Sequence, residues 1–290
     1  MDSYSVIVTA HNMERLIDRT LQTVETCIEA FSRRGHGTAR LQAEIIVVDD
    51  GSSDGTRHVV DNHAAGKSVY RLIHHETATS PSCARNAGVN ASSGAPLFFL
   101  DGDDLFYPNH ILVCQQALAD PQVDFVKTRV HLADPVHDDW RTRINHSLVI
   151  NLCVRRSCHD AVGGFPDYHL FARRDGRFHH ETDLFFKFED MYYNELIARL
   201  FRGVGVARET VEYVRHPGNA FDRQYAKFQL PFAHRPQPSE EDNFRLHLCD
   251  AILEHRLHCL RQSLSQGSQR PQSGAADRSP DPAPVHSQTP

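Results

Sequence analysis

The first hundred residues alternate between two patterns of apolar positions. Short runs of consecutive apolar residues, many of them β-branched, stand at 5–10, 44–48, 69–73 and 96–100. Such runs are typical of strands buried on both faces of a parallel sheet. The intervening segments space apolar residues three or four positions apart, which predicts helices. The alternation therefore predicts an α/β fold with a doubly wound, mainly parallel sheet and helices on both faces.

Polar residues mark where some helices begin. Asn12 is placed to cap the helix after the first strand, and Ser80 followed by Pro81 is placed to begin a later one. Beyond residue 100 the spacing predicts further elements, namely a helix over 109–120, strands over 124–130 and 148–154, and a helix over 184–200.

The end of the chain has a different pattern. Ser239 precedes a predicted amphipathic helix with an apolar stripe from Phe244 to Leu264. Its polar face mixes acidic and basic residues, whereas a basic face would suit an anionic membrane. We therefore expect the stripe to pack on the rest of the chain or on a second copy in a homodimer, and membrane association to be at most peripheral. Residues 265–290 contain few large apolar residues, which predicts a disordered tail.

Composition narrows the class of protein. The 290 residues carry a formal net charge of -6 and scattered basic residues, so no nucleic-acid partner is expected. No run of about 20 apolar residues predicts a transmembrane helix, and no signal-peptide pattern is recognisable. The seven cysteines form no C-x-x-C pair, which favours reduced core thiols and a cytoplasmic protein.

The candidate chemistry lies in the loops after the strands, at 9–12, 49–56 and 101–104. Asp101, Asp103 and Asp104 follow a buried apolar run, and burying unpaired carboxylates is costly. A hard divalent cation such as Mg²⁺ or Mn²⁺ would justify them, since it takes oxygen ligands. The alternative is a plain Asp-Gly turn. Ligands of doubly wound sheets bind at this edge, so the three loops predict one site.

Taken in order, these segments resemble a family 2 glycosyltransferase with the GT-A fold. The resemblance covers residues 4–216 and rests on five motifs: the opening strand at 5–12, with Thr-Ala-His-Asn replacing the commoner Pro-x-Tyr-Asn; the nucleotide-binding signature at 45–56; the helix near the diphosphate at 84–88; the DxD metal motif at 101–103; and the ED motif, which supplies the base, at 189–190.

The resemblance implies that a sugar is transferred, with inversion, from a nucleotide diphosphate sugar to a hydroxyl group. The expected nucleotide is UDP. The acceptor would be a glycan, a lipid-linked or a small molecule, as in polysaccharide or glycoconjugate synthesis. The nucleotide-binding residues it implies are Thr9, Ala10, His11, Asn12, Asp49, Asp50, Arg85, Asp101 and Gly102. For Mn²⁺ or Mg²⁺ it implies Asp103 with Asp101 or Asp104. His216 would contact the diphosphate or the metal, and a plain turn before Pro217 is the alternative.

Individual roles follow from this resemblance. Asp50 would bind the nucleobase, and Arg85 would clamp phosphate oxygens with its planar fork, unless it is a helix-surface charge. Asp49 could instead shape its loop, because aspartate favours turns. Asp190, with Glu189 beside it, would be the base, since direct attack on the sugar needs one carboxylate near the acceptor hydroxyl. The diphosphate and Glu189 would raise its pKa.

One feature departs from the family pattern. Twenty-three residues separate Phe165 from Glu189, whereas the acidic pair usually follows sooner. The insert at 167–188 contains a rival pair, Glu181 and Asp183, and the same Asp183 could join His179 and His180 at a metal, although a solvated loop is favoured. The insert's Arg173 and Arg174 suggest an anionic or polar acceptor.

The predicted organisation is a catalytic domain over 1–216, a helical extension over 217–264 and a tail over 265–290. A non-catalytic nucleotide-sugar-binding scaffold is the main alternative, and loss of turnover with retained nucleotide binding would identify it. A sugar nucleotidyltransferase is disfavoured, because residues 10–14 form no Gly-rich basic loop after the first strand.

Overall fold

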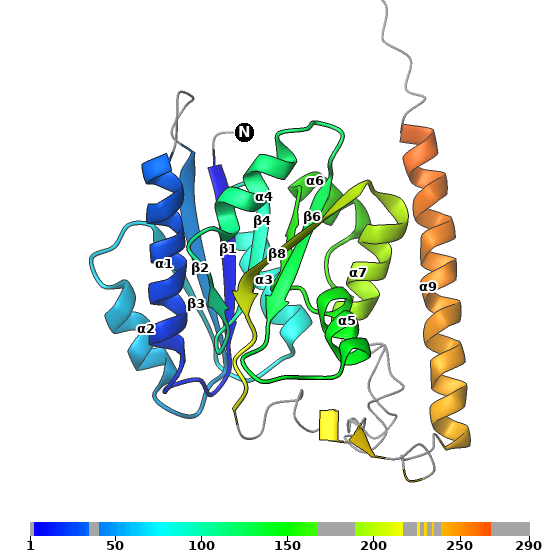
Figure 1. Cartoon of the computed structure of the whole chain (residues 1–290), viewed down its shortest axis with the longest axis horizontal. Coiled ribbons are helices and arrows are strands. Elements are labelled where there is room, and N and C mark those ends of the chain that lie inside the picture. Colours follow the sequence, from blue (N-terminus) through cyan, green and yellow to red (C-terminus); the bar gives the residue numbers. More distant parts are fainter. Residues whose placement is uncertain are drawn as a thin grey trace, which may run out of the picture.

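The computed structural model describes residues 3–34, 41–166, 189–216, 225–226, 229–230, 234 and 239–267 (Figure 1). In this part of the chain eight strands form one sheet in the order β3-β2-β1-β4-β7-β6-β8-β5. The strands are β1 (Ser3–Ala10), β2 (Gln42–Asp50), β3 (Tyr70–His75), β4 (Leu97–Asp101), β5 (Leu105–Phe106), β6 (Phe125–His131), β7 (Leu152–Val154) and β8 (Gly203–Glu212).

Helices pack on both faces of this sheet (Figure 1). The helices are α1 (Ile17–Arg34), α2 (Thr56–Ala64), α3 (Pro81–Ala91), α4 (His110–Leu118), α5 (Asp138–Ser147), α6 (Arg156–Val162), α7 (Glu189–Leu200) and α9 (Glu240–Gly267). The first four strands of the order are mutually parallel, and β6 is parallel to β8. Only β7 and β5 run antiparallel to their neighbours among the described strands. The prediction of a doubly wound, mainly parallel α/β sheet is confirmed.

Two hydrophobic cores lie on opposite faces of the sheet. Along β1, Val6 and Val8 belong to one core and Ile7 to the other, because successive side chains of a strand point to opposite faces. The first core includes residues of α1, α2 and α4, and the second includes residues of α3, α6, α7 and α9. Burial on both faces explains why β1, β2 and β4 are continuous apolar runs.

Some elements differ from the sequence prediction. The strand expected over 148–154 is reduced to β7, and β5, α5, α6 and β8 were not predicted. β8 includes two glycines and two exposed charged residues, Arg208 and Glu209, so it lacks a continuous apolar run. Its place in the sheet depends on pairing with β6, which is distant in sequence. The helix expected from 184 is described from Glu189 onward.

The two predicted helix starts had different outcomes. Ser80 caps α3, because its hydroxyl accepts a hydrogen bond from the Cys83 N–H, and Pro81 takes the first helical position. The prediction that Asn12 caps the next helix is wrong. Asn12 has a φ of +56°, and α1 begins only at Ile17.

The long helix α9 packs on α7, as the packing interpretation of its stripe predicts. Cys249, Leu253, Leu257 and Leu260 are buried there, whereas Phe244 and Leu248 are exposed, so the middle of the helix makes the contact. The helix extends to Gly267, three residues into the segment predicted to be disordered, and the remainder of that segment lies outside the described residues. None of the helices in the described ranges has the length and apolar content to cross a membrane.

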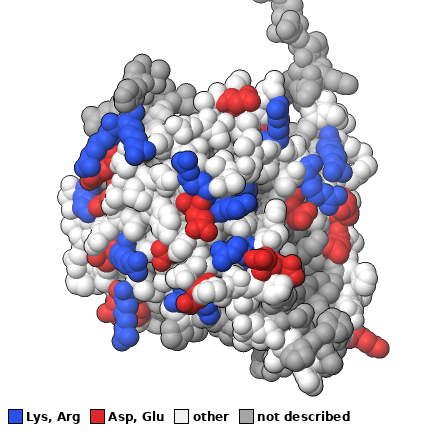
Figure 2. Space-filling view, in the orientation of Figure 1, with Lys and Arg blue, Asp and Glu red and all other residues white. Residues whose placement is uncertain are grey.

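Charge and cysteines follow the distribution expected from the sequence. On the face seen in Figure 2, basic and acidic side chains of the described residues are interspersed and form no single-sign patch. All seven cysteines are free, and five of them are buried, so the prediction of core thiols holds for those five.

Candidate active site

Three polar loops meet at one edge of the sheet, at the carboxyl ends of β1, β2 and β4. The strand ladders place Thr9 opposite Asp101 and Ala10 opposite Asp49. Because these strands are parallel, the loops after them leave the sheet at the same edge, where ligands of such sheets bind. The convergence predicted from the sequence is therefore confirmed.

A cavity of about 490 Å³ opens at this edge. Nine of the predicted nucleotide or metal residues line it, namely Thr9, Ala10, His11, Asp50, Arg85, Asp101, Gly102, Asp103 and His216. The rest of its wall consists of Met13, Ala78, Thr79, Ser80, Pro81, Ala84 and Tyr213. Segments far apart in the sequence, β1 and the stretch after β8, thus close around one space.

Asp50 is held in this wall by the segment between β3 and α3. Its carboxylate accepts hydrogen bonds from the Thr79 N–H at 3.1 Å and from the Thr79 hydroxyl at 2.7 Å. His75 Nδ1 lies 2.7 Å from the same carboxylate. Gly51 permits this close turn, since its φ is +68° and a Cβ there would lie 2.2 Å from the Ala78 nitrogen. The carboxylate is therefore fixed before any ligand binds.

Two predicted nucleotide-binding residues, Asn12 and Asp49, do not line the cavity. Asp49 is buried, and its Oδ1 accepts a hydrogen bond from the Ser52 N–H at 3.3 Å. Asn12 Oδ1 accepts one from the Ser53 N–H at 2.8 Å. Both side chains shape the loop after β2, which is the alternative role considered for Asp49.

Arg85 lies between two carboxylates that are far apart in the sequence. Its guanidinium donates to Asp190 Oδ1 at 2.6 Å and to Asp101 Oδ1 at 2.8 Å, and the residue is only 4% exposed. Burial lowers the pKa of the guanidinium, but the two carboxylates outweigh this effect and raise it. Arg85 is therefore not the helix-surface charge considered as an alternative. Its fork holds two carboxylates at the edge of the cavity.

The close approach of α3 to β1 brings Arg85 to this position. A Cβ at Gly88 would lie 2.4 Å from Ile7 Cγ2, so only glycine lets the helix pack at this distance without a shift. Ala84, one residue before Arg85, is buried in the core on the same face of the sheet. The segment 84–88 thus contains both Arg85 and the small residues, Ala84 and Gly88, that let α3 pack close to the sheet.

Asp190 stands in the first turn of α7, beside Arg85. Burial raises the pKa of Asp190 to about 7, and the neighbouring Glu189 adds to this effect. The positive charges of Arg85 and Lys127 oppose it. Burial also raises the pKa of Glu189. A carboxylate that titrates near neutral pH is well suited to accept a proton from a hydroxyl group.

The predicted metal ligands differ in their positions. Asp103 Oδ2 lies 2.8 Å from His216 Nε2, and both residues line the cavity with Asp101. Burial and the charge of Asp101 raise the pKa of Asp103, so the two carboxylates repel each other. Within the described residues no group of three or more His, Cys, Asp or Glu side chains is already arranged around a metal position.

Asp104 has a different environment from the other two aspartates of its loop. It is 1% exposed and does not line the cavity, and its Oδ1 accepts a hydrogen bond from the Val214 N–H at 2.9 Å. Burial, together with the charge of Asp103, raises the pKa of Asp104 well above its ordinary value. This geometry tethers the segment after β8 to the loop.

The rival acidic pair belongs to the insert between α6 and α7. Glu181 and Asp183, together with His179 and His180, lie in the range 167–188, outside the described residues. Arg173 and Arg174, which suggested an anionic acceptor, lie there too.

Sequence reasoning missed one charged residue near Asp190, Lys127 of β6. Its amine donates hydrogen bonds to Asn151 Oδ1 at 3.0 Å, to Asn194 Oδ1 at 3.2 Å and to the Leu148 carbonyl oxygen. Asn194 lies one helical turn after Asp190 in α7. The available signal was a lone lysine inside the strand pattern 124–130, which is normally a solvent-facing position.

Comparison with known proteins identifies related sequences. Residues 5–189 match the family model described as Glycosyl transferase family 2. Over 186 residues the chain is 25% identical to Glycosyltransferase AglE of Haloferax volcanii, and the match covers 59% of this chain. The matched region spans 58% of the length of AglE.

Two solved structures illustrate the likeness in fold. S. aureus TarS 1-349, in complex with UDP-GlcNAc, superposes with a TM-score of 0.57 at 16% identity, over 91% of this chain and 92% of that one. The mannosyltransferase PcManGT from Pyrobaculum calidifontis, in complex with GDP-Man and Mn²⁺, gives a TM-score of 0.53 at 17% identity, over 94% and 76% of the two chains. At these identities the likeness concerns the fold.

Proposed function

This chain belongs to glycosyl transferase family 2, and we propose that it transfers a sugar from a nucleotide diphosphate sugar to an acceptor hydroxyl with inversion at the anomeric carbon. One observation carries this proposal. A single buried guanidinium, that of Arg85, binds Asp101 in the wall of the cavity and Asp190 at the start of α7. A donor site and a base would thus be held side by side.

The cavity would bind the donor. Asp50 is the candidate ligand of the nucleobase, and Thr9, Ala10, His11 and Gly102 would contact the nucleotide through the walls they form. The complexes of TarS with UDP-GlcNAc and of PcManGT with GDP-Man support a nucleotide-sugar donor for this fold. We propose UDP as the nucleotide.

The carboxylates of the cavity suit a divalent cation. Asp101 and Asp103 offer oxygen ligands and His216 an imidazole nitrogen, which are donors that Mn²⁺ accepts. A cation would also relieve the repulsion that raises the pKa of Asp103. Mg²⁺ and Mn²⁺ are often held by one or two carboxylates plus substrate phosphates, so a complete protein cage is not required. When bound, the cation would neutralise charge on the departing diphosphate.

The reaction would be a direct displacement. The acceptor oxygen forms a bond to the anomeric carbon while the bond from that carbon to the diphosphate oxygen breaks, and the bonding pair leaves with the diphosphate. Asp190 accepts the hydroxyl proton on a carboxylate oxygen. Its other hydrogen bond, from Arg85, would hold the carboxylate in the orientation needed. One displacement inverts the anomeric centre.

The domain boundaries are part of the proposal. We assign donor binding and catalysis to residues 1–216, because the cavity wall runs from Thr9 to His216. We also propose that the following extension supports the helix that carries Asp190, because α9 packs on α7.

Nucleotide titration tests the donor site. We expect UDP to bind in the presence of Mn²⁺, as measured by isothermal titration calorimetry, and the affinity to fall at least roughly tenfold in EDTA, because charged phosphate contacts through a metal are lost. Asp103→Asn should remove most of this metal dependence, whereas the exposed Asp139→Asn should leave it unchanged.

The same titration with GDP identifies the nucleobase of the donor. Tighter binding of GDP than of UDP would change the donor assignment but keep the enzyme class. If neither nucleotide binds with or without metal, the donor site is wrong. Nucleotide binding without any sugar transfer or donor hydrolysis would favour the non-catalytic scaffold.

The pH dependence of kcat/KM tests Asp190 as the general base. Asp190 must be deprotonated to accept a proton, and its pKa is raised to about 7. We therefore expect kcat/KM to rise about tenfold per pH unit below pH 7 and to level off above it. Lys127→Met removes a positive charge that opposes the shift and should move the midpoint to higher pH. A midpoint near pH 4 would indicate a solvated carboxylate instead.

A further inference from the structure

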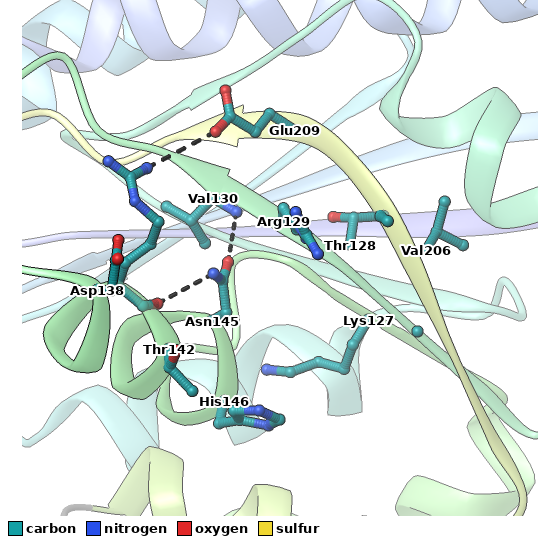
Figure 3. Close-up of a pocket in the computed structure, with 13 residues that line it drawn as sticks. Lys127, Thr128, Arg129, Val130, Asp138, Thr142, Asn145, His146, Val206 and Glu209 are labelled. Atoms are coloured by element: carbon teal, nitrogen blue, oxygen red, sulfur yellow. Dashed lines mark hydrogen bonds and ion pairs between the residues drawn. The ribbon is translucent and has the colours of Figure 1, made fainter.

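A second cavity lies between β6, β8 and α5, apart from the donor cavity. We call it the β6–β8 groove; its volume is about 490 Å³. Figure 3 shows that Lys127 of β6 and Thr142, Asn145 and His146 of α5 surround the same space. Nothing in the proposed donor chemistry uses these side chains, apart from the effect of Lys127 on the base.

An irregularity of the sheet creates the groove. Lys127 pairs with Gly205 and Val130 with Val211, so three residue steps in β6 are matched by six in β8. The extra residues of β8 bulge away from its partner strand and open space beside β6. Bulges of this kind often stand next to functional sites, where they redirect side chains.

The opposite wall of the groove is fixed. Asn145 Oδ1 accepts a hydrogen bond from the Val130 N–H at 2.8 Å, and its amide nitrogen donates to the Arg141 carbonyl oxygen at 3.0 Å (Figure 3). The first of these bonds ties α5 to β6 at the bulge. The space is thus preformed.

The groove carries unpaired donors. The side chains of Arg129, Thr142 and His146 line it and form no hydrogen bond or ion pair with the described residues. Two acidic residues also line it. Glu209 lies 3.8 Å from the guanidinium of Arg141, which leaves Asp138 as the other acidic residue of the lining, beside Arg129 and the amine of Lys127.

Lys127 places an amine at the bottom of the groove, where Asp190 is the charged group that favours its protonated form. Its hydrogen-bond acceptors are the side-chain oxygens of Asn151 and Asn194 and the carbonyl oxygen of Leu148, all uncharged. Burial lowers the pKa of this amine to about 7. An anion in the groove would stabilise the charged form.

A further cavity extends from the groove toward the start of α7, where Asp190 stands. It has a volume of about 390 Å³, shares Lys127, His146 and Gly205 with the groove and is lined by Met191, the residue after Asp190. On the other side, β8 leads from Glu209 in the groove to Tyr213 in the donor cavity. A ligand in the groove would therefore approach the reaction centre from the α7 side.

From this geometry we propose that the β6–β8 groove binds a phosphate or carboxylate group of the sugar acceptor, with Arg129, His146 and Thr142 as its ligands. The proposal rests on the proposed function, in which Asp190 receives the acceptor proton. The acceptor is accordingly an anionic polyol or glycan whose hydroxyl reaches Asp190 while its anion occupies the groove.

The test uses a matched pair of small probes, sn-glycerol 3-phosphate and glycerol, titrated into the full chain saturated with UDP and Mn²⁺ and followed by ligand-observed NMR. We expect the phosphate to bind and glycerol not to bind. Arg129→Gln should weaken phosphate binding about tenfold or more, because a charge-assisted contact is lost. Arg208→Gln, an exposed arginine of β8 that does not line the groove, should bind like the unmodified chain.

The outcomes separate the two proposals. Equal binding of both probes, equal affinity of the Arg129→Gln and Arg208→Gln variants, or loss of phosphate binding as UDP saturates would overturn the groove assignment. UDP affinity and donor hydrolysis should be unchanged in Arg129→Gln. If UDP does not bind at all, the donor proposal fails, and comparing the two arginine variants without UDP still reports on the groove.

Discussion

Asp190→Asn should reduce kcat by roughly 10³-fold while leaving the KM for the donor nearly unchanged, since a positioned general base contributes about 10²–10⁴-fold. Asp190 does not line the donor cavity, so donor binding does not depend on it directly. Asparagine keeps an oxygen that can accept the hydrogen bond from Arg85 at nearly the same place. The substitution therefore removes the proton acceptor with little change of shape.

Glu189→Gln is the matched control for this result. Glu189 is adjacent, half-buried, and raises the pKa of Asp190. Its neutralisation should lower that pKa and move the acid limb of kcat/KM to lower pH, with kcat at pH 8 changed only a few-fold. Initial rates of sugar transfer across the pH range measure both effects.

Other results of these substitutions would assign the general base to a residue other than Asp190. If Asp190→Asn retains more than a tenth of kcat and Glu181→Gln or Asp183→Asn loses it, the acidic pair of the insert 167–188 supplies the base. If donor hydrolysis and transfer both persist in all of these variants, general-base catalysis by a carboxylate is wrong for this chain.

Arg85→Met should destabilise the fold by about 3 kcal/mol and abolish transfer. Removing one partner of a buried ion pair costs about 3–5 kcal/mol because it leaves an uncompensated charge. We expect the lower end, since the Asp101 side chain is 30% exposed and can still be hydrated. Urea unfolding measures the free energy, and a change in the midpoint without a change in slope would show that stability alone has changed.

Arg85→Lys separates stability from geometry. Lysine keeps the charge but is a point donor, so it cannot bind Asp101 and Asp190 with one planar fork. We expect this variant to recover most of the stability while transfer remains at least about tenfold impaired, because the base is no longer held against the donor site. The exposed Arg19→Met should affect neither quantity. Full activity in Arg85→Lys would show that Arg85 contributes only its positive charge and not the geometry of its fork.

Much of the fold and nine residues of the cavity wall could be predicted from local sequence patterns. The runs at 5–10, 44–48 and 96–100 identified β1, β2 and β4, because strands buried on both faces require continuous apolar residues. Parallel connection through helices then brings their carboxyl ends to one edge. Nine predicted residues of the cavity wall followed from this rule and from the family motifs.

Contacts between distant segments could not be read in this way. Nothing local in the sequence indicates that Arg85 binds Asp190, which is 105 positions away, or that the lysine of β6 donates to α7. β8 escaped prediction because its residues are held by the ladder with β6 and not by a local apolar pattern. The β6–β8 groove, which depends on the register of that ladder, escaped with it.

The sequence by itself determined the alternation of strands and helices from β1 to β4, the edge at which the polar loops meet and the family, since periodicity and motifs are local properties. Only the tertiary structure decided which charges pair, which aspartate of each loop faces the cavity and which is buried as a tether, and where β8 opens the groove. Burial and desolvation arise from packing between residues far apart in the chain, and these set the partners and the pKa of Asp190.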